Sequence, residues 1–320
     1  MKNHFSDNIK ISAILPNYNS VEFLSRAIQS LLDQTEAFTE ILIVDDGSTD
    51  DSLSVIREFM RSHSIIRLLR HEKNQGVCKA LNYGIEQATG DYIILCAADD
   101  WYHEQIVALA KKIIRNHPSV GLICGDAIVN RYDKNVSFRR MLPYARKNAF
   151  ISAAEFTTLS RNSYVGFNGG GGMFMNRQAV LAAGMLHSKL RWHCDWLLYF
   201  VVAFQQGLYY CDEIFVYVNL RKGSYSEGRN IWKQQKQVML DTVQILSQHY
   251  PALWGAFKAA ALLPSYAIRY IPLFLFYPML RRFFTIKLLW KLLLNNKMVV
   301  RIGRLFPYWI ILGVRKLLRA

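Results

Sequence analysis

Short apolar runs alternate with longer amphipathic runs in the first part of the chain. In the segment SVEFLSRAIQSLLDQ, hydrophobic residues recur every three or four positions, so they form one stripe along a helix. Similar amphipathic segments follow DDGSTDDS and begin at QGVCKALNYGIEQATG. The apolar runs between them are short and rich in Ile, Leu and Val, which predicts buried strands at 11–15, 41–44, 65–69 and 92–96.

Continuous apolar strands that alternate with helices predict a parallel sheet with helices on both faces. In such sheets, ligands bind beyond the carboxyl ends of the strands. Those ends read PNYN after the first strand, DDGS after the second and AADD after the fourth. We therefore expect polar and acidic residues at one edge of the sheet. The first strand is not followed by GxGxxG, and the sequence has no GxxxxGK[ST], which argues against dinucleotide-binding and P-loop sites.

Charge is distributed unevenly along the chain. The net charge is +15, yet residues 242–320 contain twelve Lys and Arg and no Asp or Glu. The residues before them carry 27 basic and 24 acidic side chains and are nearly neutral. A nucleic-acid-binding domain would carry its basic residues on the folded domain itself, so no nucleic acid is expected as a partner.

The cysteines and the first residues indicate where the protein resides. The five cysteines contain no CxxC pair, and several lie in apolar runs. This predicts small buried side chains in a reducing compartment, and neither a disulfide framework nor a zinc site. The segment MKNHFSDNIK has no apolar stretch of a secretory signal, so the first domain is expected in the cytoplasm.

The segment GDYIILCAADDW places two adjacent carboxylates, Asp99 and Asp100, after an apolar run. Their mutual repulsion would be relieved by a hard divalent cation, Mn²⁺ or Mg²⁺, which takes oxygen ligands. Such an ion would neutralise the charge that develops on a departing diphosphate. Taken alone, the pair is better explained as a solvated turn or as the cap of a helix that begins near His103, because turns favour Asp.

Four segments in order resemble the family 2 glycosyltransferases, which have the GT-A fold. They are ISAILPNYNSVEFLSRAIQSLLDQT, EILIVDDGSTDDS, NQGVCKALNYGIEQATGDYIILCAADD and HCDWLL, within residues 9–225. The resemblance implies a doubly wound, mostly parallel α/β sheet. It also implies an inverting, metal-dependent hexosyltransferase that moves a sugar from a nucleotide-diphosphate donor to an acceptor hydroxyl. We expect a catalytic domain at 1–230, with a nucleotide-sugar half at 1–125 and an acceptor half at 126–230, and a helical region at 231–320.

The same resemblance implies roles for individual residues. Asp46 would accept a hydrogen bond from the base of the donor, and Asp100 would bind the cation, with Asp99 beside it at the donor. Asp195 in HCDW would be the catalytic base, although the family often has Glu-Asp where this chain has Cys194-Asp195. The other donor-binding candidates are Pro16, Tyr18, Asn19, Asn74, Gly76 and Lys79.

Each assignment has a plainer alternative. Asp46 could cap the following helix, and Asp195 could complement the dipole of the helix that it begins. On the acceptor side, Gly170 and Gly171 in a run of four glycines would allow a ligand to approach closely, or would form an ordinary surface loop. Trp196 and Arg221 are further acceptor-side candidates, Arg221 because it lies in a loop that could close over the diphosphate.

The C-terminal residues 251–320 mix Leu, Phe and Trp with Lys and Arg, which is typical of helices that lie in a membrane interface. Each basic residue near anionic lipid contributes roughly 1 kcal/mol. Residues 259–280 carry one charge and approach the ~20 residues that a span needs, but three prolines interrupt them. Peripheral or monotopic attachment to the cytoplasmic face of the cell membrane is expected. A single span and a soluble helical subdomain remain alternatives.

Attachment to a membrane indicates an acceptor as well. A transferase held at an anionic membrane surface would extend a glycan or lipid-linked acceptor, as in the synthesis of a cell-envelope polysaccharide. The alternative function is a catalytically inactive scaffold or lipid-binding module that retains the GT-A fold.

Overall fold

The computed structural model of the chain describes residues 9–131, 135–144, 146–168, 171–220, 231–264 and 270–294. The chain divides into two compact units. Unit 1 consists of residues 1–153, 166–188 and 194–224, and unit 2 of residues 154–165, 189–193 and 225–320. Unit 1 therefore ends close to the boundary expected at residue 230, while two short earlier segments belong to unit 2.

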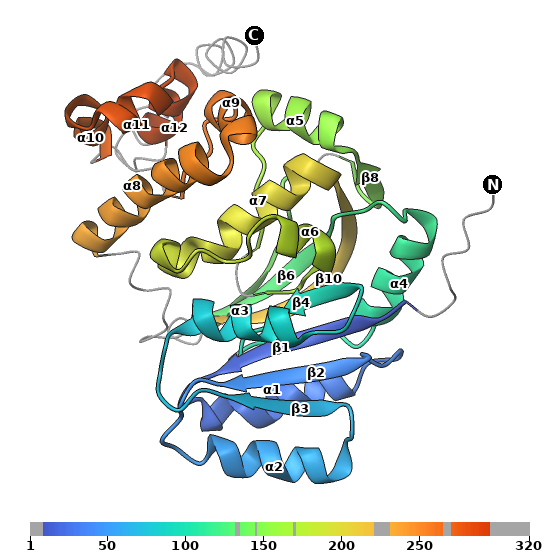
Figure 1. Ribbon diagram of the computed structural model, residues 1–320. Coiled ribbons are helices and arrows are strands. Elements are labelled where there is room, and N and C mark those ends of the chain that lie inside the picture. Colours follow the sequence, from blue (N-terminus) through green and yellow to red (C-terminus); the bar gives the residue numbers. More distant parts are fainter. Residues whose placement is uncertain are drawn as a thin grey trace. The chain divides into compact units, whose positions relative to one another are not determined.

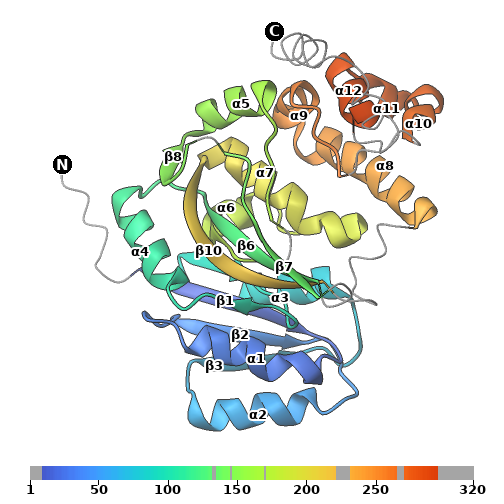
Figure 2. The same ribbon diagram turned by 180° about the vertical axis from the view of Figure 1, so that it is seen from behind.

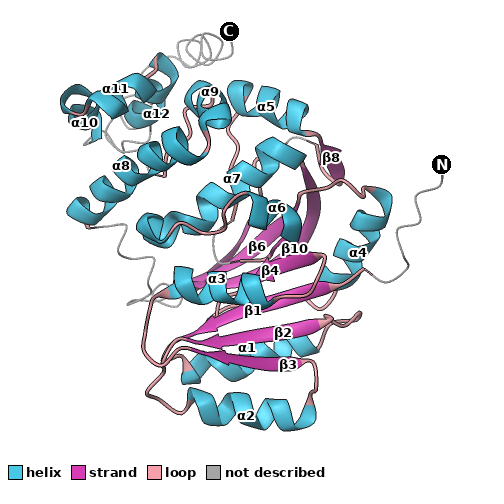
Figure 3. Cartoon of the chain, viewed as in Figure 1, coloured by secondary structure: helices cyan, strands magenta, loops and turns pink. Residues whose placement is uncertain are grey.

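Unit 1 is built on one sheet (Figures 1 and 3). Its strands are β1 (Ile11–Asn17), β2 (Glu40–Asp45), β3 (Ile66–Arg70), β4 (Tyr92–Leu95), β5 (Trp101–Tyr102), β6 (Leu122–Arg131), β7 (Val136–Arg140), β8 (Ala149–Ile151), β9 (Met173–Asn176) and β10 (Leu208–Leu220). Its helices are α1 (Val21–Leu32), α2 (Ser52–Ser62), α3 (Val77–Gln87), α4 (Ile106–Asn116), α6 (Arg177–Ala182) and α7 (Cys194–Gln206).

The strand order is β3-β2-β1-β4-β9-β6-β10-β5, with β7 beside β6 and β8 beside β10. The four apolar runs form β1 to β4, which are mutually parallel, and β6 is parallel to β10. The expected mostly parallel sheet is therefore confirmed. The pattern did not indicate that β9 would lie between β4 and β6 and run antiparallel to both.

Helices cover both faces of this sheet, which explains why its central strands are apolar throughout. One core cluster joins alternate residues of β1, such as Ile11 and Leu15, with α1, α2 and α4. Ile14 points to the other face, where it contacts Gly84 of α3. Figure 1 shows α3, α6 and α7 over the near face, and Figure 2 shows α1, α2 and α4 over the opposite one.

Unit 2 is helical over its described residues. It contains α5 (Ala153–Asn162) from Ala154 onward and the later helices α8 (Trp232–His249), η4 (Pro251–Leu253), α9 (Trp254–Ala259), α10 (Ile271–Phe276), α11 (Pro278–Phe283) and α12 (Ile286–Leu294). The short 3-10 helix η2 (Ser188–His193) comes directly before α7 in the sequence. Across the described residues, no helix combines the length and the apolar character needed to cross a membrane.

Two lysines of α12 bind the ends of other helices in unit 2. Lys287 donates hydrogen bonds to the carbonyl groups of Ser160 and Arg161 at the end of α5. Lys291 donates to the carbonyl groups of Ala260 (2.8 Å) and Ala261 after α9. Cations at helix C-termini complement the helix dipole and satisfy carbonyl groups that lack helical partners. Burial, with a further contribution from Lys287, lowers the pKa of Lys291 to about 7.

Candidate functional site

The carboxyl ends of β1 and β2 are joined by buried hydrogen bonds. Asp45 accepts bonds from the side-chain amide of Asn17 (3.0 Å) and from the N–H of Ser48 (3.1 Å). The N–H of Asp46 donates to the carbonyl of Asn17 (2.8 Å). Asp45, the first acid of DDGS, therefore holds the ends of β1 and β2 together. Asp46, the second acid, lies at the edge of the sheet.

Asp46 is buried and binds the segment between β3 and α3. Its Oδ1 accepts bonds from the N–H of Gln75 (2.9 Å) and from Nδ1 of His71 (2.7 Å). Its Oδ2 accepts a bond from the N–H of Gly76 (2.7 Å), the N-cap residue of α3. His71 in turn stacks on Tyr83, with 5.3 Å between the ring centroids. In the structure Asp46 anchors this loop, and direct contact with a nucleotide base stays a prediction.

Gly47 brings the DDGS turn against the same loop. Its φ is +75°, and a Cβ atom there would lie 2.8 Å from the backbone of Lys73 and from the nitrogen of Asn74. Only glycine adopts this conformation readily and permits this approach. Asn74 and Lys79, two of the donor-binding candidates, are exposed beside this contact, and Gly76 is half-buried.

The three candidates at the end of β1 differ in their surroundings. Pro16 is half-buried within the strand, whereas the ring of Tyr18 is exposed. Asn19 binds the neighbouring loop, because its Oδ1 accepts bonds from the N–H groups of Thr49 (2.8 Å) and Asp50 (3.3 Å). Asn19 therefore joins the β1–α1 and β2–α2 loops although it is exposed, and Tyr18 presents an exposed aromatic ring beside it.

The carboxylate pair lies in a fixed turn after β4. Asp100 is 3% exposed, and its Oδ1 accepts a bond from the N–H of Asn219 (2.8 Å) in β10. The side-chain amide of Asn219 donates to the carbonyl of Asp99, which is half-buried. The helix that follows has Gln105 as its N-cap residue, so the pair does not cap it. These bonds also differ from those of a freely solvated turn.

The glycine run approaches this turn through Gly171. Its φ is +86°, and a Cβ atom there would lie 2.3 Å from the carbonyl oxygen of Leu95, the last residue of β4. It would also lie 3.2 Å from the hydroxyl of Tyr102. Gly171 therefore packs against the segment that leads to Asp99 and Asp100. Gly170 and Arg221 lie outside the described residues.

Asp195 lies in the first turn of α7 and is half-buried. Its Oδ1 accepts a bond from the N–H of Trp196 (2.7 Å), whose ring packs on Phe200. Burial raises the pKa of Asp195 to about 6, although backbone hydrogen bonds at the start of the helix lower it. A carboxylate with a pKa near neutrality suits a general base.

Buried neighbours connect Asp195 with the carboxylate pair. Tyr199 lies one turn after Asp195, and its pKa is raised by burial and by the charges of Asp195, Cys194 and Cys96. Burial raises the pKa of Cys96 to about 12, and the charge of Asp100 adds to this shift. Tyr199 and Cys96 are therefore close enough to interact electrostatically with each other, and each with one of the two acidic positions.

A second connection runs from α7 to α3. The hydrogen bond with Cys78 and burial raise the pKa of Cys194, the residue before Asp195. Cys78 lies in the first turn of α3, two residues after Gly76, whose N–H binds Asp46. Asp46, Asp100 and Asp195 thus all lie in unit 1 and are related through α3, α7 and their neighbours. All five cysteines are buried thiols, as expected for small core side chains.

The candidate carboxylates that would hold a divalent cation are Asp99 and Asp100. In the part of the chain that the structure describes, no group of three or more His, Cys, Asp or Glu is arranged to hold a metal ion. An ion that binds together with a diphosphate needs only one or two carboxylates, because water and phosphate oxygens supply its other ligands. Asp99 and Asp100 fit that smaller requirement in number and chemistry, and they do not fit a cage of protein ligands alone.

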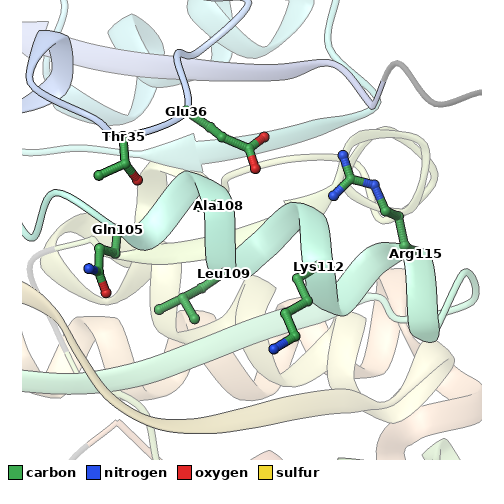
Figure 4. A pocket seen from close by; sticks show the side chains of 7 residues that line it. All are labelled: Thr35, Glu36, Gln105, Ala108, Leu109, Lys112 and Arg115. Carbon is green, nitrogen blue, oxygen red and sulfur yellow. The ribbon is translucent and has the colours of Figure 1, made fainter.

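A surface pocket of about 450 Å³ lies away from these residues (Figure 4). It is lined by Thr35, Glu36, Gln105, Ala108, Leu109, Lys112 and Arg115. Thr35 and Glu36 precede β2, whereas Asp46 and the Asp99–Asp100 pair follow the carboxyl ends of β2 and β4, and Asp195 begins α7. This pocket therefore contains none of them.

Two residues of the site were not expected from the sequence. His71 follows β3 directly and binds Asp46, and Asn219 lies at the end of β10 and binds the carboxylate pair. Both are polar residues at carboxyl ends of strands. The rule that drew attention to DDGS and AADD, applied to every strand, would indicate both as polar residues at that edge, but it would not show which acid each one binds.

Comparison with known proteins places residues 12–182 in the family model described as Glycosyl transferase family 2. An uncharacterized glycosyltransferase of Nostoc sp., alr2836, is 36% identical over 128 residues, which cover 40% of this chain and 40% of that protein. The uncharacterized glycosyltransferase YibD of Escherichia coli is 41% identical over 91 residues, or 28% of this chain and 26% of that protein. The matched segments thus span less than half the length of these relatives.

Solved structures resemble the fold over a larger part of the chain. The crystal structure of S. aureus TarS 1-349 has a TM-score of 0.57 at 17% identity and covers 79% of this chain and 70% of that one. The same TarS fragment in complex with UDP-GlcNAc has a TM-score of 0.58 at 16% identity, with 79% and 71% covered. At these identities the likeness shows the fold.

Proposed function

The chain belongs to glycosyl transferase family 2, and we propose that it transfers a sugar from a nucleoside-diphosphate donor to an acceptor hydroxyl with inversion at the anomeric carbon. One observation carries this proposal. Asp46, Asp100 and Asp195 are far apart in the sequence, yet all three lie in unit 1 and are related through α3 and α7: Asp46 binds the N-cap residue of α3, Cys78 of α3 binds Cys194 beside Asp195, and Asp100 and Asp195 act electrostatically on the neighbouring Cys96 and Tyr199. The half-buried Asp195, whose pKa is raised by burial to about 6, favours an active enzyme over a scaffold that has lost its chemistry.

In the proposed reaction, Asp195 removes the proton from the acceptor hydroxyl. The oxygen of that hydroxyl attacks the anomeric carbon, and the bond from this carbon to the diphosphate oxygen breaks. The donor leaves as a nucleoside diphosphate, and the proton passes from Asp195 to solvent. A divalent cation bound at Asp100 would supply neutralising charge for the departing diphosphate.

We assign the remaining candidate residues to the binding of the sugar-nucleotide donor. The loop anchored by Asp46 presents Asn74, and the first turn of α3 after it carries Lys79, which suits a phosphate because it is an exposed cation. The exposed ring of Tyr18 suits a nucleotide base. The base itself is proposed to be uracil because the similar TarS fragment was solved with UDP-GlcNAc.

Nucleotide binding is the direct test of this function. We expect UDP and a UDP-sugar, with Mn²⁺, to raise the melting temperature, since a ligand at one hundred times its dissociation constant stabilises the native state by about 2.7 kcal/mol. Uridine, which lacks the diphosphate, and GDP, which has another base, serve as controls. A panel of sugar nucleotides that leaves the melting temperature unchanged would contradict the proposal, and measured sugar transfer would exclude the inactive-scaffold alternative.

We propose that the protein works at the cytoplasmic face of the membrane on a lipid-linked acceptor. In unit 2, Phe276 is 76% exposed and Ile286 is 75% exposed, and Arg281 and Arg282 between them in the sequence are exposed cations. From residue 242 onward the sequence has no acidic residue. Exposed apolar and basic side chains on short helices are suited to an anionic interface. Residues 295–320 of this region lie outside the described residues.

A double variant tests the membrane contact. Phe276→Asp with Ile286→Asp should weaken binding to phosphatidylglycerol vesicles roughly 100-fold, because each inserted side chain contributes about 1.5 kcal/mol or more. Sedimentation with vesicles measures this effect. Phe138→Asp is the matched control, since Phe138 is an exposed aromatic residue of β7 in unit 1. Equal sedimentation of the double variant and the wild type would argue against this surface.

A further inference from the structure

Asn219 connects the carboxylate pair with the interior of the sheet. It is 7% exposed, and its backbone N–H donates to Asp100 Oδ1 (2.8 Å) while its side-chain amide donates to the carbonyl of Asp99. Its Oδ1 accepts a bond from the side-chain amide of Asn130 (3.3 Å). The Oδ1 of Asn130 in turn accepts a bond from the hydroxyl of Ser137 (2.7 Å).

These three polar residues lie in register across neighbouring strands. Asn219 of β10 is paired with Asn130 of β6, and Asn130 is paired with Ser137 of β7. Because the strands are hydrogen-bonded to one another along their length, each side chain is held at a fixed position. The line of bonds therefore begins in the sheet and ends at the turn that carries Asp99 and Asp100.

The bonds also determine which way the Asn219 amide points. An asparagine side chain has one oxygen that accepts and one NH₂ group that donates. Since Asn130 donates to the oxygen, the NH₂ group faces the carbonyl of Asp99. That carbonyl belongs to the peptide between Asp99 and Asp100. Its orientation is thereby fixed, together with the Asp100 carboxylate that the backbone of Asn219 holds.

We propose that Asn219 is a positioning residue for the donor, which holds the Asp99–Asp100 turn in the form that receives a diphosphate with its divalent cation. This inference rests on the proposed function and extends it to a residue of the last strand. Truncation of the side chain leaves the backbone bond to Asp100 but removes the bond to Asp99. In a variant without this side chain, the bound ligand must itself order the Asp99–Asp100 turn. Loss of such supporting partners commonly costs 10–100-fold in affinity at metal sites.

Calorimetric titration with UDP tests the inference. With Mn²⁺ present, Asn219→Ala should bind UDP 10–100-fold more weakly than the wild type, and without Mn²⁺ the two should bind alike. Asn130→Ala should show a smaller loss, because it removes only the bond that orients Asn219. The matched control is Asn148→Ala, since Asn148 accepts a bond from Asp212 earlier in β10. Its UDP affinity should be unchanged even if its stability falls.

Amide hydrogen exchange gives a second readout that general destabilisation would not reproduce. Asn219→Ala should exchange faster over residues 97–101 at low temperature, while the other strands keep their protection. Unchanged UDP affinity with Mn²⁺ in Asn219→Ala would overturn the inference and leave the proposed function intact. A wild type that binds no UDP would overturn the proposed function and the donor role of Asn219 with it. If exchange over residues 97–101 became faster while UDP affinity stayed unchanged, Asn219 would be a purely structural residue.

Discussion

Asp195→Asn should reduce sugar transfer by about 10²–10⁴-fold, the usual contribution of a general base. The amide has nearly the same shape and can still accept the hydrogen bond from Trp196, so the first turn of α7 should be retained. UDP affinity should also be retained, because the proposed role of Asp195 concerns the acceptor. The measurement is kcat with a fixed donor and acceptor, together with UDP titration. Wild-type turnover in this variant would remove Asp195 from the mechanism.

The pH dependence of the wild type follows from the same residue. A base must be deprotonated to accept a proton, and burial raises the pKa of Asp195 to about 6. The rate kcat/KM should therefore rise with pH through about 6 and level off above it. The residual activity of Asp195→Asn should lack this rising limb.

The stability of Asp195→Asn should change in the direction opposite to its activity. Because the pKa of Asp195 is higher in the folded protein than its ordinary value of 3.8, its contribution to stability is complete below pH 3.8 and is lost as the pH rises through about 6. At pH 7 the ionised carboxylate thus costs stability. The neutral amide should raise the free energy of unfolding by about 3 kcal/mol at pH 7, since each pKa unit corresponds to about 1.4 kcal/mol.

Asp212→Asn is the matched control for this stability change. Lys147 and Arg139 bind Asp212 and lower its pKa, so its ionised form stabilises the folded protein. Its replacement should lower stability at neutral pH, the opposite sign to Asp195→Asn. Denaturant titrations at pH 7 compare the two variants. A loss of stability in both would show that the charge of Asp195 is compensated in the folded protein.

The sequence predicts those elements of the fold that local patterns of apolar and polar residues determine. The apolar runs around Ile14, Ile43 and Ile94 form the parallel strands β1, β2 and β4, whose two faces are both buried. The apolar run MFM of β9 has the same local character, yet it runs antiparallel. The direction of a strand depends on the path of the chain before it, and this path cannot be predicted from local composition.

The candidate site shows more clearly that local sequence patterns do not predict contacts between distant segments. DDGS and AADD stand out because acids follow apolar strands, and the sheet does bring polar residues together at that edge. The partners of these acids could not be read in the same way. Asp46 binds Gly76, 30 positions later, and Asp100 binds Asn219, 119 positions later. Only the pairing and register of the strands determine such contacts, so a sequence indicates the acids before it indicates the residues that hold them.

Asp100→Asn should remove the effect of Mn²⁺ on UDP binding and lower turnover roughly 100–1000-fold, since charge stabilisation by a bound cation is worth several kcal/mol. The amide oxygen can still accept the N–H of Asn219, so the variant changes the charge and keeps the turn. UDP affinity measured with and without Mn²⁺ separates this effect from misfolding.

Asp99→Asn is the matched control, because Asp99 is the adjacent carboxylate, less buried and held through its carbonyl. We expect it to retain most of the Mn²⁺ effect. A larger loss in Asp99→Asn than in Asp100→Asn would exchange the two roles. A wild type whose UDP affinity is the same with and without Mn²⁺ would contradict the cation site at Asp100. The proposed reaction would then have to rely on cations such as Lys79 to stabilise its leaving group.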